Sequence, residues 1–448
     1  MRRYYSLFIA IIAALAGLLF GYGTGVMSGA ILFIAEEFAL SSGMNGLVVG
    51  IVLVGAFLGA LLTGWMGDRL GRKKVIMLGA TIFFVASLGT ALVFSVTALI
   101  IGRFFVGVAI GIASYIAPLY ISEIAPPERR GALVSMNQLA ISGGILLSYI
   151  VNYSFASSGH WRPMLGLGTV PAALLFFGMC YLPDSPRGVL LKNGEGEAKK
   201  ILQKIRGKRE VSKELREMKK SLKSNIRNWK ALFSKSIRRI VWVGFGLAII
   251  QQVTGINTIF YYAPTILNLA GFQTATAAIL ATVGLGLVSF LFTIFSLFVI
   301  DKLGRRTLLL IGLVGMSIGL ALLTSSLHDP NLAPLMLFSM CLYIVSFAIS
   351  LGPIVWLMIS EIFPLKVRSV GASLATAMNW ICNFLVTVTF LKLVEGEGIS
   401  WTFGIYLILT LASLLFVYFF IPETRGISLE KIEEDLLSGK PLRKLGHD

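Results

Sequence analysis

The sequence predicts an all-helical integral membrane protein with twelve transmembrane helices arranged as two six-helix halves. Of its 448 residues, 56% are hydrophobic and only 14% are charged, whereas soluble domains carry about 25% charged residues. In addition, two short motifs each occur twice, in the same order. GDRLGRKK at 67–74 returns as IDKLGRRT at 300–307, and SEIAPPERRG at 122–131 returns as SEIFPLKVRSVG at 360–371. A duplicated membrane unit is typical of solute transporters.

The individual spans follow from the apolar runs. A helix needs about 20 apolar residues to cross a bilayer, and open sheet edges are not viable in lipid, so each run is expected to be helical. The expected spans are 7–34, 46–66, 75–95, 97–121, 132–155, 163–182, 240–269, 275–299, 307–326, 333–359, 369–391 and 402–421.

The basic residues predict how these spans are oriented. Of the 39 Lys and Arg residues, only Arg162 and Lys392 fall in loops on the opposite side, and Arg103 lies inside a span. By the positive-inside rule, both termini and the 184–239 loop are expected to be cytoplasmic. The formal charge of +17 therefore indicates topology and contact with an anionic leaflet, and not nucleic-acid binding.

The expected domain organisation follows the duplication. Residues 1–183 form the first bundle and 240–421 the second, joined by a cytoplasmic linker at 184–239 and followed by a tail at 422–448. The linker contains the charge-alternating sequence SKELREMKKSLK at 212–223, which is typical of short surface helices. A third repeat supports the duplication, because PDSPRG at 183–188 ends the first half and PETRG at 422–426 ends the second.

The repeated motifs predict a cytoplasmic gate. Gly71 and Gly304 permit tight turns next to helix ends, and the neighbouring basic residues can form ion pairs with the acidic residues that end the fourth and tenth spans. Such pairs would hold the two halves together when the cavity faces outward; the alternative is that the basic residues only enforce topology. The expected gate residues are Asp68, Arg69, Arg72, Glu123, Arg130, Asp301, Arg305, Glu361 and Arg368.

Amide side chains inside the spans are candidates for binding a solute. A buried amide without a partner costs several kcal/mol, and amides both donate and accept hydrogen bonds, as the hydroxyl groups of a solute do. Residues 251, 252 and 257 do not share one face of an ideal helix. We expect Thr254-Gly255 to interrupt the helix so that these three converge, as discontinuous transporter helices do. The amides are Gln138, Gln251, Gln252, Asn257 and Asn379.

Aromatic side chains are expected to complete this site. Trp356 and Trp380 can provide flat apolar walls for the faces of a ring-shaped solute, and Tyr262 can provide a further wall or a gate. The alternative is that the buried amides and indoles only tie helices together.

These motifs make the chain resemble the sugar porter family of the major facilitator superfamily, over residues 15 to 430. Further family-like strings are GLLFGYGTGVMSGA at 17–30, GRFFVG at 102–107, NQLAISGGILLSYIVN at 137–152, QQVTGINTIFYYAP at 251–264 and GPIVWLMISEIFP at 352–364. The resemblance implies the major facilitator fold and the transport of a monosaccharide by alternating access. It also implies sugar contacts at the amide and tryptophan positions named above.

One position departs from the family. Proton-coupled members have an aspartate in the first helix, and this chain has Gly23 there, while the partner arginine is present as Arg103. The spans hold no central Asp, Glu or His, so we expect an uncoupled facilitator. The alternative is a sugar:proton symporter that uses a carboxylate at a helix end, such as Glu123. Because an intramembrane guanidinium needs water, an anion or carbonyl groups, we expect a hydrated cavity between the first and fourth helices.

Other function classes are disfavoured. An enzyme would need clustered His, Cys, Asp or Glu, and the sequence has no HExxH or P-loop string. A channel would be expected to have symmetric polar rings, and a carrier of amines or drugs would need a buried carboxylate. We expect no cofactor and no metal, a sugar and the lipid bilayer as partners, protons under the alternative, and a monomer in the inner or plasma membrane. The sequence does not name the sugar.

Overall fold

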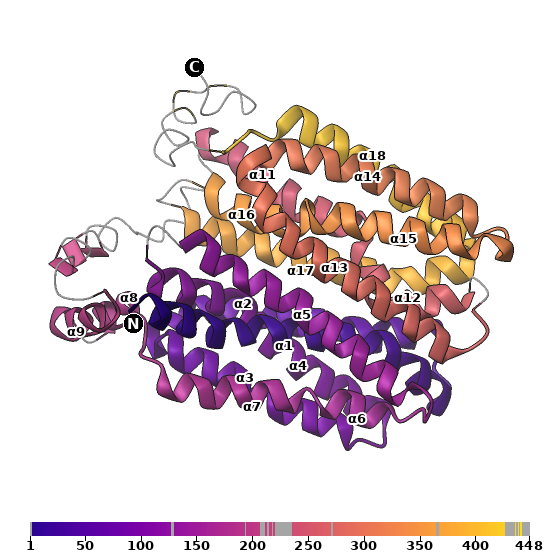
Figure 1. Ribbon diagram of the computed structural model, residues 1–448, viewed down its shortest axis with the longest axis horizontal. Helices are drawn as coiled ribbons and strands as arrows, with labels where there is room; N and C mark the ends of the chain where they lie inside the picture. The colour runs from indigo at the N-terminus through magenta and orange to yellow at the C-terminus, as the bar shows by residue number, and fades with distance from the viewer. Residues whose placement is uncertain are drawn as a thin grey trace. The chain divides into compact units, whose positions relative to one another are not determined.

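The computed structural model describes residues 2–126, 130–192, 194–206, 211–212, 215–216, 218–219, 235–269, 272–363, 367–425, 435, 438 and 440. The regular secondary structure of these residues is helical (Figure 1). The chain divides into two compact units. Unit 1 comprises Met1–Ala39 and Leu47–Ser224, and unit 2 comprises Leu40–Gly46 and Asn225–Asp448. The division after Ser224 falls inside the expected linker; the expected bundle boundaries remain predictions.

The two units each contain a set of long helices. The helices of unit 1 are α1 (Arg2–Glu37), α2 (Ser42–Leu70, whose first residues belong to unit 2), α3 (Arg72–Ala91), α4 (Val96–Ile124), α5 (Arg130–Ala156), α6 (Trp161–Gly166), α7 (Thr169–Tyr181), α8 (Pro186–Lys192) and α9 (Glu195–Arg206). Those of unit 2 are α11 (Lys235–Val253), α12 (Ile256–Leu269), α13 (Ala275–Leu303), α14 (Arg305–Ser326), the 3₁₀ turn η3 (Pro330–Leu332), α15 (Ala333–Ala348), α16 (Leu351–Ile362), α17 (Arg368–Glu397) and α18 (Ile399–Phe420).

The prediction of twelve transmembrane helices is confirmed. Within the described residues, 12 stretches are long and apolar enough to cross a membrane. Nine of them are single helices. The other three are interrupted, as α6 followed by α7, α11 followed by α12, and α15 followed by α16. An interruption at membrane depth is tolerated only where protein or a water-filled cavity satisfies the freed backbone groups.

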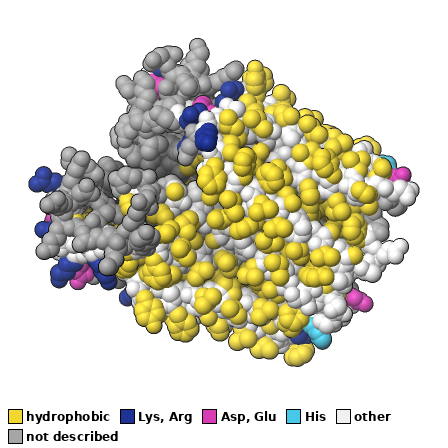
Figure 2. All heavy atoms as spheres, in the orientation of Figure 1, with side chains coloured by type: hydrophobic (Ala, Val, Ile, Leu, Met, Phe, Trp, Pro, Cys, Tyr) yellow, Lys and Arg dark blue, Asp and Glu magenta, His cyan; other side chains and the backbone are white. Residues whose placement is uncertain are grey.

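Large apolar side chains cover the outside of the helices. Phe177, Phe298 and Ile408 expose 63%, 66% and 67% of their surface, respectively. Figure 2 shows a broad face on which hydrophobic side chains predominate, with Lys and Arg side chains gathered towards one end. An apolar surface of this extent is not compatible with water and is expected for contact with acyl chains.

In unit 1, glycines let helix backbones touch. A Cβ at Gly21 of α1 would lie 1.9 Å from the Ile141 carbonyl oxygen of α5. A Cβ at Gly107 of α4 would lie 2.0 Å from the Val52 carbonyl oxygen of α2. Small residues are the usual means by which membrane helices approach this closely, because lipid offers no hydrophobic driving force between helices.

In unit 2, aromatic rings fill the corresponding spaces. A Cβ at Gly244 of α11 or at Gly371 of α17 would lie 2.5 Å from the Phe363 ring. Likewise, a Cβ at Gly246 would lie 2.1 Å from the Phe416 ring of α18. The α11 surface is therefore shaped to receive rings from the ends of α16 and α18.

The described part of the linker is helical, as the charge alternation predicts. Its helices α8 and α9 pack with residues 211 and 215 around a small hydrophobic core, in which Ala198 and Leu202 are fully buried. An ion pair between Lys219 and Glu195 lies on the exposed side. This core belongs to the linker helices, which also contact α1 and α4 of unit 1.

Candidate functional site

The seventh span is interrupted between α11 and α12, where the sequence predicts a break. Helix α11 ends at Val253, Gly255 has φ +88°, and α12 begins at Ile256. A Cβ at Gly255 would lie 2.7 Å from the Tyr406 ring, so the position requires glycine both for conformation and for space. The Tyr343 hydroxyl donates to the Thr254 carbonyl oxygen at 2.7 Å and so satisfies one freed backbone group.

Around this break, four of the predicted amides form one hydrogen-bonded cluster. Gln252 donates to the Asn379 oxygen at 3.0 Å, and Asn379 donates to the Gln251 oxygen at 2.8 Å. Asn257, in the first turn of α12, donates to the Gln252 oxygen. The break therefore brings the last turn of α11 and the first turn of α12 to the same part of α17. We call Gln251, Gln252, Asn257 and Asn379 the amide cluster.

The cluster is anchored to backbone carbonyls at two points. Gln251 donates to the Leu351 carbonyl oxygen at 2.8 Å, beside the interruption between α15 and α16. Asn379 donates to the Ala248 carbonyl oxygen of α11 at 3.0 Å. These bonds fix the direction of each amide plane, because a carbonyl can only accept.

Burial divides the cluster into two layers. Gln251, Gln252 and Asn379 expose 3%, 5% and 1% of their surface and bond one another. Asn257 is half-buried, and within the described residues its side-chain oxygen accepts no hydrogen bond. The outer layer thus retains the capacity to bind a solute, while the inner layer sets its orientation.

The predicted aromatic residues take different positions. Trp356 is half-buried on α16, whereas Trp380 is 1% exposed and follows Asn379 on α17. Tyr262 is fully buried; its hydroxyl donates to the Thr387 carbonyl oxygen at 3.3 Å and its ring stacks on Phe390. Tyr262 therefore packs α12 against α17, and no described contact brings it to the amide cluster.

Gln138, the amide predicted from the first half, lies on α5 of unit 1. Its side chain is half-buried, and it forms no hydrogen bond with another described residue. Its donors and its acceptor are therefore available for a solute, whereas Asn257 already donates to Gln252 and offers its oxygen.

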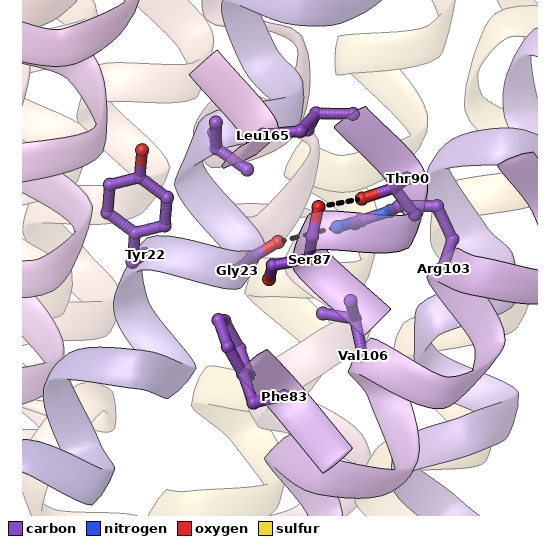
Figure 3. A pocket seen from close by; sticks show the side chains of 9 residues that line it. Tyr22, Gly23, Phe83, Ser87, Thr90, Arg103, Val106 and Leu165 are labelled. Carbon is purple, nitrogen blue, oxygen red and sulfur yellow. Dashed lines mark hydrogen bonds between the residues drawn. The ribbon is translucent and has the colours of Figure 1, made fainter. Parts of the chain in front are cut away.

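A small cavity borders the first and fourth helices in unit 1 (Figure 3); that it is hydrated remains a prediction. The Arg103 side chain is 2% exposed and donates to the Gly23 carbonyl oxygen of α1 at 3.1 Å. A Cβ at Gly23 would lie 2.8 Å from the Ile110 side chain and 3.2 Å from the Phe83 ring. The backbone of α1 therefore lies directly beside the guanidinium.

Arg72 and Glu123 form the ion pair that the repeated motifs predict. The Arg72 Nε lies 3.1 Å from one Glu123 carboxylate oxygen, and its Nη2 donates to the other at 3.2 Å. Both side chains are buried. Both also belong to unit 1, so the expectation that this pair joins the two halves is wrong. The recurrence of the motif does not distinguish a pair within one half from a pair between halves.

The remaining gate residues are only partly described. Arg69 lies over the Trp65 ring, with 4.6 Å between its guanidinium carbon and the ring centroid. Arg305 begins α14, directly after the turn at Gly304. The side chains of five predicted gate residues lie outside the described residues, namely Asp68, Arg130, Asp301, Glu361 and Arg368.

Two acidic residues that the site prediction omits cap the helices after the repeated turns. The Asp184 carboxylate accepts from the Lys73 backbone N–H at 3.2 Å. Glu423 accepts from the backbone N–H groups of Arg305 and Arg306 at 2.9 and 3.1 Å. A carboxylate at a helix N-terminus satisfies free N–H groups and the helix dipole. The recurrence of PDSPRG as PETRG is the sequence signal that identifies these two residues.

A second omitted cluster lies at the opposite end of unit 1. Glu37, at the end of α1, accepts a bidentate pair of hydrogen bonds from Arg162 at 3.1 and 2.7 Å and one from the Trp161 indole at 2.6 Å. The Arg162 guanidinium also lies over the rings of Phe94 and Trp161. Arg162 lies in the first turn of α6, and it is one of the few basic residues that the sequence places on the side opposite most Lys and Arg residues. This exception to the charge pattern is the signal that points to it.

Comparison with known proteins gives consistent matches along the whole chain. The family model described as "Sugar (and other) transporter" matches residues 9–436. The galactose-proton symporter of Escherichia coli K12 is 41% identical over 451 residues, covering 99% of this chain and 97% of the relative. The D-xylose transporter of Levilactobacillus brevis is 42% identical over 444 residues, covering 97% of each chain.

Solved structures agree with the fold. The proton:xylose symporter of the major facilitator superfamily, solved with bound 6-bromo-6-deoxy-D-glucose, superposes with a TM-score of 0.84 at 32% identity. The match covers 97% of this chain and 99% of that one. An inward-open xylose transporter from Escherichia coli matches with a TM-score of 0.83 over 96% of this chain and 99% of that one, also at 32% identity.

Proposed function

Because the chain belongs to the sugar transporter family of the major facilitator superfamily, we propose that it carries a monosaccharide across the cell membrane by alternating access, in symport with protons. The observation that carries the sugar-binding part of this proposal is the amide cluster at the break between α11 and α12. No covalent chemistry is part of the proposal.

The two layers of the cluster have separate roles in this proposal. Asn257 and Trp356 in unit 2 are half-buried and meet the sugar directly, through the Asn257 amide and the indole face. Gln138 is the amide of unit 1 that we expect to meet the sugar during the transport cycle. The buried Gln251, Gln252 and Asn379 hold the outer layer in place, and a sugar hydroxyl can replace one of their mutual bonds without loss, because it both donates and accepts.

Proton coupling is supported by the relatives. The galactose-proton symporter shares 41% of its residues over nearly the full length of both chains. This favours the alternative interpretation of the sequence, symport, over the expectation of an uncoupled facilitator. We assign the titrating group to Glu123, which is buried at the predicted cytoplasmic end of α4 and faces Arg72. Among the described residues, Arg187 and Asp184 are charged groups that also lie beside this end of α4.

One observation favours a second function, uncoupled transport. Position 23 carries glycine, so the carboxylate that couples protons in the resembled family is missing there. Under this second interpretation, the protein is an uncoupled facilitator that moves the sugar down its gradient.

One experiment separates the two interpretations. Sugar is added to de-energised right-side-out vesicles that contain the protein, and the external pH is recorded. Symport predicts a sustained external alkalinisation that depends on the protein, and its absence would establish the facilitator. A panel of glucose, galactose, xylose, arabinose and polyols in the same assay identifies the substrate.

The assignment of Glu123 is tested separately with Glu123→Gln, which keeps the shape and a hydrogen-bond acceptor next to Arg72. We expect this variant to retain sugar counterflow and to lose the alkalinisation. An unchanged alkalinisation would show that Glu123 does not carry the proton, whereas loss of counterflow as well would show that its role is structural. Membrane sidedness, with both termini cytoplasmic, and the monomeric state remain predictions.

A further inference from the structure

The Thr254 carbonyl oxygen loses its helical partner at the break between α11 and α12. In an unbroken helix it would accept a hydrogen bond from the backbone N–H of Thr258, but that N–H donates to the Gly255 carbonyl oxygen at 3.0 Å. Thr254 is fully buried, and a buried carbonyl group without a partner is costly. The broken backbone therefore needs a donor from another helix.

Tyr343 of α15 supplies this donor. Its hydroxyl group donates to the Thr254 carbonyl oxygen at 2.7 Å, and its side chain is fully buried. The hydroxyl group and the backbone N–H of Thr258 are thus alternative donors to one carbonyl oxygen. The bond from Tyr343 favours the broken backbone, whereas a bond from Thr258 would favour a continuous helix.

The span formed by α15 and α16 holds the break at a second point. Gln251 donates to the Leu351 carbonyl oxygen at 2.8 Å, at the start of α16. The break is therefore fixed at Gln251, just before it, and at Thr254, within it, by residues of one interrupted span. Of these two contacts, only the bond at Thr254 involves the backbone that is freed by the break.

Tyr406 of α18 also packs against the break, but in a different way. A Cβ at Gly255 would lie 2.7 Å from the Tyr406 ring. The Tyr406 hydroxyl is buried and has no hydrogen-bond partner within the described part of the chain. Tyr406 thus fills space beside the break, while Tyr343 donates to it. The two tyrosines form a matched pair in which one hydroxyl group is bonded to the break and the other is not.

We propose that Tyr343 is a positioning residue for the sugar site, which acts through the Thr254 carbonyl group to keep Asn257 next to Gln252. Asn257 lies in the first turn of α12 and donates to the Gln252 oxygen. Without the Tyr343 hydroxyl, the carbonyl can return to the Thr258 N–H and close the helix across the break. A continuous helix places the side chains at 252 and 257 about 140° apart, so the Asn257 amide leaves the cluster. This role rests on the proposed function, because it requires that Asn257 binds the sugar.

Tyr343→Phe and Tyr406→Phe test the role of the hydroxyl group, because each removes one buried phenol oxygen beside the same break. We expect sugar affinity, measured by tryptophan quenching, to be roughly 3-fold to 10-fold weaker in Tyr343→Phe and unchanged in Tyr406→Phe. In sugar counterflow, Tyr343→Phe should raise KM and keep the maximal rate close to that of the wild type. A merely structural role would instead lower the amount of folded protein or the maximal rate, with KM unchanged.

A double-mutant cycle with Asn257→Ala shows whether Tyr343 acts through Asn257. We expect Asn257→Ala to weaken sugar binding, and the double variant to bind no more weakly than Asn257→Ala, because both changes remove the same contact. Wild-type affinity in Tyr343→Phe, or additive losses in the double variant, would overturn the positioning role and leave the sugar site in place. Wild-type affinity in Asn257→Ala would contradict the proposed sugar contact and the role of Tyr343 with it.

Discussion

Replacing Gly304 with alanine should destabilise unit 2 strongly, for two reasons that the structure separates. Gly304 precedes α14 with φ +90° and ψ +159°, a backbone region that is essentially restricted to glycine and costs other residues about 1–3 kcal/mol. The new Cβ would also lie 2.5 Å from a Glu423 carboxylate oxygen. Displacing this carboxylate removes the cap of α14, which contributes about 1–2 kcal/mol. Together these effects predict a loss of about 2–5 kcal/mol.

Thermal unfolding of the purified protein, followed by tryptophan fluorescence, measures this loss. Gly404→Ala is the matched control, because Gly404 lies in α18 and a Cβ there meets no atom within 4 Å. We expect Gly404→Ala to unfold at or slightly above the wild-type midpoint, since alanine is favoured over glycine inside a helix by about 0.5–1 kcal/mol. Gly304→Ala should unfold well below it.

The repeat in unit 1 provides an independent check of the same reasoning. A Cβ at Gly71, directly before α3, would lie 2.3 Å from an Asp184 carboxylate oxygen, whereas a Cβ at Gly89 within α3 meets nothing within 4 Å. Gly71→Ala should therefore be destabilising and Gly89→Ala should not. Equal midpoints for Gly304→Ala and Gly404→Ala, or for the corresponding pair in unit 1, would refute the proposed role of these carboxylates.

Three further predictions concern other parts of the two units. Gly255→Ala should lower both the unfolding midpoint and the sugar affinity, because its Cβ would lie 2.7 Å from the Tyr406 ring. An unchanged sugar affinity, measured by tryptophan quenching, would show that the helix break is not needed for sugar binding. Gly21→Ala should abolish the folded protein in size-exclusion chromatography, since its Cβ would lie 1.9 Å from the Ile141 carbonyl oxygen; a monodisperse, active variant would contradict the close packing of α1 on α5. Arg162→Lys should lower stability by no more than about 1 kcal/mol, because its pair with Glu37 is partly exposed; a larger fall in the midpoint would show that the pair acts as a buried one.

Local chemistry made much of the fold predictable. Helix count follows from the length and polarity of apolar runs. The break at Gly255 could be predicted because an unbroken helix would point the three amides at 251, 252 and 257 in different directions. The turns at Gly71 and Gly304 follow from a glycine placed between a helix end and a basic run, and both glycines have φ +90°.

Contacts over long sequence distances were not predictable in the same way. The Asp184 carboxylate, which caps α3, is 111 residues along the chain from Lys73, whose backbone N–H donates to it. Nothing in the repeated PDSPRG and PETRG strings specifies that partner. For Arg72 and Glu123, the pairing could be predicted from charge, but their location within one unit could not. Similarly, the amides could be recognised as polar groups in lipid, while their division into a saturated inner layer and an available outer layer depends on packing.

The account depends most directly on the amide cluster at the break between α11 and α12. Sugar affinity should be measured by tryptophan quenching for Gln252→Ala, and for Gln273→Ala as an exposed control outside the cluster. Removing the Gln252 amide releases Asn257 and should weaken binding by about 1–3 kcal/mol, which is a loss of roughly 5-fold to 150-fold, while Gln273→Ala should bind as the wild type does. Wild-type affinity in Gln252→Ala would contradict the assignment of the sugar site to this cluster.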